Sequence, residues 1–174
     1  LPAALQGIFS DPEHAGRTSF LRSLLRLALR YPYHVLYHAH PLPGTCLLLM
    51  LALSLAALLD KRREQHAAAY FLAGTALTAA AEILYAVLWP HPNFMMYAVN
   101  VLALLCFVLT PPSDADAARR LALLWWLPGM LYSALIILGS NQGHFAIFSA
   151  AASAVPCSVT VAFRTAKHVF PERK

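Results

Sequence analysis

The chain has 174 residues, of which 59% are hydrophobic and 12% are charged, and its formal net charge is +5. Soluble domains are usually about 25% charged, so 13 basic and eight acidic side chains are too few to cover a soluble protein of this size. The composition excludes a soluble globular enzyme, a disordered tail and a secreted disulfide scaffold, and it predicts an all-α polytopic membrane protein.

Residues 1–40 form a predicted arm before the membrane-spanning part. Arg22, Arg26 and Arg30 recur every fourth residue among leucines, which predicts an amphipathic helix over Ser19–Arg30. Such a helix lies in the interface with its arginines toward lipid headgroups, although packing on a partner protein fits the same pattern. The chain begins at Leu1 rather than Met, which suits a cleaved mitochondrial targeting peptide or an incomplete chain.

A group of histidines ends the arm. His34 and His38 are four residues apart, on one face if this stretch is helical, and His40 follows closely. Membrane metal oxidases use several such histidine boxes, whereas this chain has one, so a metal site here is a weak hypothesis. Interleaved tyrosines favour an interfacial aromatic belt instead. We expect no cofactor other than bound phospholipid.

Residues 41–165 form a predicted transmembrane bundle, and 166–174 a basic tail. Five apolar runs in the bundle approach the roughly 20 residues that cross a hydrocarbon core, and helices are the form that satisfies their backbone in lipid. The runs are Pro41–Leu59, His66–Trp89, Phe94–Thr110, Leu121–Gly139 and Phe145–Phe163. We therefore predict five transmembrane helices, with kinks at Pro128 and Pro156.

In the predicted bundle, basic residues occur in every second loop between the apolar runs. With five spans, one side of the membrane, called here the basic side, carries Lys61, Arg62, Arg63, Arg119, Arg120, Arg164, Lys167, Arg173 and Lys174. The opposite side carries basic residues only in the arm. The positive-inside rule places the basic side in the cytoplasm or the mitochondrial matrix. Anionic lipid is therefore the expected partner of these charges, and nucleic acid is not.

A layer of polar residues is predicted inside the bundle. Glu82 is the only formally charged residue in the five runs, and counting residues along the helices places Asn100 at nearly the same depth. The same counting adds Ser133, Ser149 and Ser153 to the layer. Glu82 is interpreted as a hydrogen-bonded clamp between helices, with a proton carrier as the alternative.

Rows of small residues predict where helices pack closely. Ala69, Ala73, Ala76 and Ala80 form such a row on the second run, and Ser149 with Ser153 form another on the fifth. The three cysteines lie in apolar runs without the spacing of a metal site, and we expect them to be buried small side chains.

The functional hypothesis is a non-catalytic accessory subunit of a larger membrane complex, with other membrane subunits and anionic phospholipids as partners. The mitochondrial inner membrane is the favoured location, in a respiratory or ATP synthase complex with cardiolipin as a suitable lipid, and a bacterial inner membrane is the alternative. Two other functions stay open. One is a small proton-coupled transporter that uses Glu82, and the other is a lipid or metal enzyme that uses His34, His38 and His40.

Overall fold

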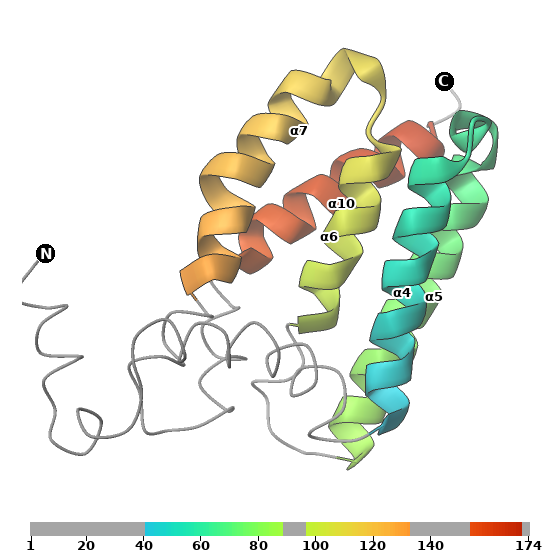
Figure 1. The fold of residues 1–174 in the computed structure, drawn as a ribbon, viewed down its shortest axis with the longest axis vertical. Coiled ribbons are helices and arrows are strands. Elements are labelled where there is room, and N and C mark those ends of the chain that lie inside the picture. The colour runs from blue at the N-terminus through green and yellow to red at the C-terminus, as the bar shows by residue number, and fades with distance from the viewer. Residues whose placement is uncertain (1–40, 89–96, 133–153, 172–174) are drawn as a thin grey trace, which may run out of the picture.

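The computed structural model describes residues 41–88, 97–132 and 154–171, and every regular element in these ranges is helical (Figure 1). This agrees with the predicted all-α class. Some predictions fall outside the described residues. They concern the amphipathic helix with Arg22, Arg26 and Arg30, the histidines His34, His38 and His40, and the serines Ser133, Ser149 and Ser153.

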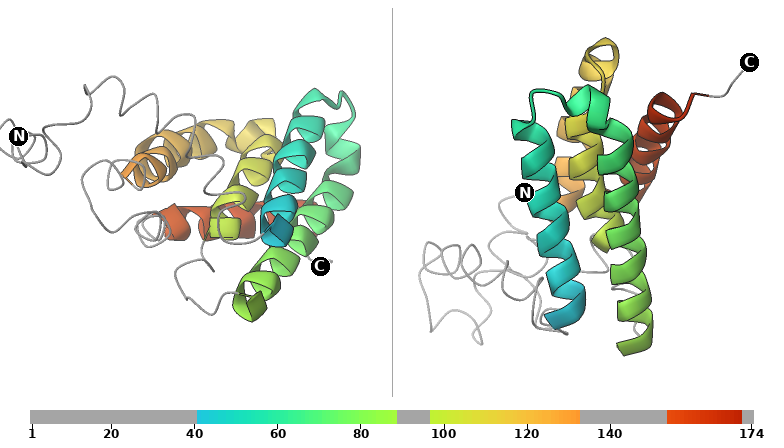
Figure 2. Two further views of the ribbon diagram at one scale, coloured as in Figure 1. Left: turned by 60° about the horizontal axis from the view of Figure 1, so that its bottom comes forward. Right: turned by 90° about the vertical axis from the view of Figure 1, so that its right-hand side faces the viewer.

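Two long helices form an antiparallel hairpin. Helix α4 spans Pro41–Leu59, the predicted bounds, and α5 spans Arg63–Leu88, beginning three residues before the apolar run at His66. Both are rich in leucine and alanine, which favour helix formation. Figure 2 shows the two helices side by side along their length. Both are long and apolar enough to cross a membrane.

The next helical segment is shorter and sharply bent. Helix α6 spans Tyr97–Leu109, which at 1.5 Å per residue is about 20 Å long. A 3-10 turn, η2 (Pro112–Asp114), follows, then α7 (Ala115–Leu121), a π-helical turn, η3 (Ala122–Trp126), and helical residues 127–132. The stretch after the prolines is bent by 112° from α6. Proline favours this break because it lacks a backbone N–H.

Helix α10 (Val155–Val169) lies at an incline to the α4–α5 hairpin (Figure 1). Pro156 lies in the first turn of α10, where proline is well tolerated. The predicted kink at Pro156 involves residues 145–153, which lie outside the described ranges. The helix that contains Pro128 has a π-helical turn, η3, just before this residue. Gly129 lies against Ala154, since a Cβ there would be 3.0 Å from the Ala154 backbone nitrogen.

The described residues do not show five spans. They contain two helices that could cross a membrane, or three if Ala98–Leu109 and Pro112–Tyr132 together make one bent span. Parts of the predicted third, fourth and fifth runs lie outside the described ranges. Helix α10 also continues past the end of the fifth run at Phe163, through the polar residues Arg164, Lys167 and His168.

The core lies where α4, α5 and α6 meet, with α10 packed against α6. Its largest fully buried apolar side chains are Tyr85, Leu47, Met50 and Leu105. The outer surface is also apolar, with exposed leucines on α4 and exposed Leu123, Leu124 and Trp125 on η3. Such a surface is expected of helices that face lipid. Cys106 and Cys157 are buried and Cys46 partly buried, all three as free thiols, as predicted.

Candidate functional site

A buried polar junction, made by Asn100, Trp126 and Ser158, joins three elements of the bundle. Asn100 of α6 is fully buried, and its side-chain Oδ1 accepts a hydrogen bond of 2.7 Å from the Ser158 hydroxyl of α10. The indole N–H of Trp126 in η3 donates to the Asn100 backbone carbonyl at 3.2 Å. One residue of α6 therefore holds both of the helical segments that follow it in the chain.

Sequence reasoning names Asn100 but misses both of its partners. Counting depth along straight helices selects serines nearer the start of the fifth run, whereas the inclined α10 brings Ser158 to Asn100. A signal for Trp126 is present in the sequence, because a buried indole N–H needs an acceptor. Nothing in the sequence says that the acceptor is a backbone carbonyl of α6.

Glu82 lies on α5, apart from the hydrogen bonds of the polar junction. Both carboxylate oxygens are buried, and no described residue makes a hydrogen bond of standard geometry to them. The backbone N–H groups of Ala98 and Val99, in the first turn of α6, face this carboxyl. The Glu82 side chain thus lies against the turn of α6 that leads to Asn100, but the two side chains do not bond to each other.

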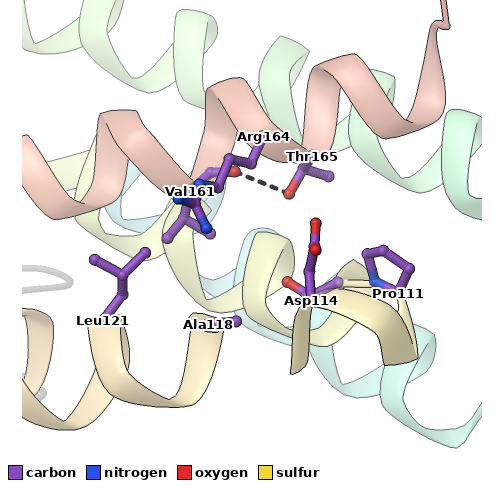
Figure 3. Close-up of a pocket in the computed structure, with 8 residues that line it drawn as sticks. Pro111, Asp114, Ala118, Leu121, Val161, Arg164 and Thr165 are labelled. Carbon is purple, nitrogen blue, oxygen red and sulfur yellow. Dashed lines mark hydrogen bonds between the residues drawn. The ribbon is translucent and has the colours of Figure 1, made fainter. Parts of the chain in front are cut away.

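A small cavity separates α10 from the η2–α7 segment near the basic side. Its volume is about 10 Å³, which is close to the size that one water molecule needs. Figure 3 shows the Asp114 side chain pointing toward α10, which contributes Arg164 and Thr165 to the lining. The Thr165 hydroxyl donates to the Val161 carbonyl at 3.0 Å. A cavity of this size has room for a structural water but not for a substrate.

The turn between α4 and α5 is held by one carboxylate. Asp60 accepts hydrogen bonds from the Arg62 backbone N–H at 2.8 Å, from His66 Nδ1 at 2.7 Å and from the Tyr70 hydroxyl at 3.2 Å. The His66 bond, followed by that of the Arg62 N–H, lowers the pKa of Asp60 below its ordinary value of 3.8. The group therefore stays ionised and fixes the basic turn Lys61–Arg63.

The two faces of α5 differ in a way that the small-residue row does not predict. The face buried inside the bundle carries Ala67, Phe71, Gly74, Thr78, Ala81 and Tyr85, at alternating spacings of four and three. The predicted row lies on the opposite face: Ala69, Ala73 and Ala76 are exposed and Ala80 partly exposed. This outward alanine row therefore takes no part in the packing of the described bundle.

A metal ion is the remaining ligand to consider for these residues. Across the described ranges, no group of three histidine, cysteine, aspartate or glutamate side chains could hold a metal ion. The arm histidines lie outside those ranges. No protein-family model, no curated protein and no solved structure matches this chain.

Proposed function

We propose that this chain is a membrane-embedded helical subunit that packs against another membrane protein through the outward alanine row of α5. The observation that carries the proposal is the exposure of Ala69, Ala73 and Ala76, one above another on a helix long enough to span. Lipid tails are as apolar as leucine, so helices in a membrane associate through close packing. Small side chains permit the closest approach.

The contrast with α4 supports this choice of surface. The exposed side chains of α4 include Leu49, Leu51, Leu55 and Leu58, which are suited to contact lipid tails. On α5 the alanines leave a shallow strip between larger exposed neighbours such as Leu72 and Ile83. A strip of this kind receives the ridge of another helix better than it receives mobile acyl chains.

The membrane that we propose is the mitochondrial inner membrane, with a bacterial inner membrane as the alternative. Lys61, Arg62, Arg119 and Arg120 are exposed around the α4–α5 turn and α7. They suit a leaflet rich in anionic lipid, cardiolipin among others. In that membrane, the chain would have an accessory role in a respiratory or ATP synthase complex.

The experiment is co-purification in mild detergent, followed by native gel electrophoresis. Replacing Ala73 and Ala76 by leucine should release the chain from its assembly, because the added bulk holds the partner helix away. The matched control places the same two substitutions at Ala52 and Ala56, which are exposed on α4. Co-migration retained by the Ala73→Leu, Ala76→Leu variant, or lost equally by the control, would overturn the proposal.

A second function, proton-coupled transport, is favoured by one observation, the two buried oxygens of Glu82 without a hydrogen-bond partner among the described residues. Buried intramembrane carboxyls often mark proton pathways. In vesicles with an internal pH dye, Glu82→Gln should abolish proton flux if Glu82 carries protons, while Glu64→Gln, in the first turn of α5, should not. Flux that survives Glu82→Gln, or no flux in the unchanged protein, argues for a structural carboxyl.

A further inference from the structure

A groove opens between the α4–α5 turn and the α6–α7 bend. Its volume is about 360 Å³, within the range of about 300–1,000 Å³ that is usual for small-molecule sites. The residues that line it are Leu58, Arg63, Phe107, Val108, Thr110, Ala115, Ala118, Arg119 and Ala122. They come from the five elements α4, α5, α6, α7 and η3, so the groove is formed by the fold and not by one helix.

The lining combines two kinds of chemistry. Leu58, Phe107, Val108 and Ala122 give the groove apolar walls, whereas Arg63 and Arg119 bring two guanidinium groups from separate helices. The lining contains no acidic residue. Within the described ranges neither guanidinium has a salt-bridge partner. The site therefore offers positive charge that the described residues leave unneutralised.

The groove lies at the end of the α4–α5 hairpin, where charged and apolar residues meet. Arg63 is the first residue of α5 and Leu58 lies in the last turn of α4, so both border the basic turn. Phe107 and Val108 belong to the last turns of α6, and Figure 1 shows this end of α6 beside that turn. A ligand with a charged head and an apolar tail matches this arrangement.

We propose that the groove binds one anionic phospholipid, with its phosphate between Arg63 and Arg119 and part of an acyl chain against Leu58 and Phe107. Guanidinium groups bind phosphate oxygens through paired, charge-assisted hydrogen bonds. A free phosphate ion would use the arginines but not the apolar walls, and a neutral lipid the walls but not the arginines. The proposal depends on membrane embedding but not on a partner at the outward alanine row.

The first test measures how many lipids stay on the purified protein. The full chain in mixed micelles receives phosphatidylglycerol or phosphatidylcholine, and native mass spectrometry counts the bound molecules. We expect one retained phosphatidylglycerol, with affinity reduced about thirtyfold in the Arg63→Gln, Arg119→Gln variant because two attractive charges are lost. The control, Arg62→Gln with Arg120→Gln, loses the same net charge at exposed residues that do not line the groove.

The second test separates a lipid from a free anion. Ala122→Phe fills the apolar wall and leaves both arginines in place, and Ala115→Leu does so from the exposed edge of the groove. Both variants should lose the lipid while circular dichroism and the SDS unfolding midpoint stay unchanged. Equal loss in the Arg62, Arg120 control, unchanged retention in the Arg63, Arg119 variant, or displacement by inorganic phosphate would overturn the proposal. Co-migration with a partner is unaffected by either outcome.

Discussion

The two faces of α5 show how one helix serves two kinds of contact. Its inward face is uneven: Phe71 meets the ring of Phe170 with centroids 6.3 Å apart, and Gly74 leaves room for Leu102 and Leu105 of α6. Its outward face is even, with alanine at successive turns. Large and small side chains alternate where the partner belongs to the same chain. A row of small residues, flanked by the larger Leu72 and Ile83, remains where no described element covers the helix.

This difference separates two meanings of a small residue in a membrane helix. Gly74 is small because a particular side chain, Leu105, fills its position, and the Thr78 hydroxyl donates to the Gly74 carbonyl at 2.8 Å. The alanines have no such neighbour in the described bundle. A small residue inside a packed pair therefore reports on the fold, and an exposed row of them reports on surface available to others.

The largest effect is expected at Gly74. A Cβ at this position would collide with the Leu105 side chain and lie 3.2 Å from Leu102 Cδ1, so Gly74→Leu should lower the free energy of unfolding by about 1–3 kcal/mol. Unfolding in SDS titrated into mixed micelles, followed by circular dichroism, measures it. An unchanged midpoint would mean that α5 and α6 do not pack as described.

A smaller loss is expected when the polar junction is broken. Ser158→Ala removes the hydroxyl that donates to Asn100 Oδ1, and interhelical hydrogen bonds in membranes contribute about 0.6 kcal/mol on average and up to about 1.7. The same SDS titration applies. Thr160→Val is the control, because the exposed Thr160 hydroxyl bonds only within α10, to the Pro156 carbonyl. Equal losses in the two variants would contradict an interhelical role.

On the outward face the effect on the isolated chain should nearly vanish. Ala76→Leu adds bulk where no described element lies, so the free energy of unfolding should stay within about 0.5 kcal/mol of the original. The measurement is made on the chain stripped of partners by harsher detergent. A loss as large as that of Gly74→Leu would place Ala76 inside the bundle and remove the distinction between the faces.

The smallest effect is expected outside both faces, at the α4–α5 turn. Because the folded pKa of Asp60 lies below 3.8, ionised Asp60 stabilises the turn fully above that pH, and the contribution is lost as the pH falls through the folded pKa. The chemical shift of the Arg62 amide should follow this titration, and Asp60→Asn should flatten it. A titration midpoint above pH 3.8 would contradict the hydrogen bonds that Asp60 accepts.

Hydropathy predicts the α4–α5 hairpin well because it measures how apolar a segment is, and this property lets a helix lie among lipid tails. The end of α4 at Leu59 agrees with the predicted end of the first apolar run, whereas α5 begins earlier than its apolar run because Arg63, Glu64 and Gln65 continue the helix beyond the apolar part. Helix length and apolar length are different quantities wherever a helix extends past the lipid tails. The same distinction applies to α10, whose last turns are basic.

Contacts between helices are harder to predict, since they depend on the angles between helix axes. The hydrophobic periodicity of a sequence does not determine these angles. Asn100 could be selected because a buried amide in an apolar run is costly. Its partner Ser158 could not, because the depth argument assumes helices that run straight across the membrane.

The helix from residue 115 to 132 holds one residue more than a regular α-helix needs, in the π-helical turn Ala122–Trp126. Loss of a residue from an ordinary turn rotates everything beyond it by about 100°. Loss of one residue from this turn would close the bulge and leave both flanks in their present rotation. Arg119 would still face its groove and Gly129 would still meet Ala154. Within the helix from residue 115 to 132, the loss of one residue is therefore best tolerated in this turn.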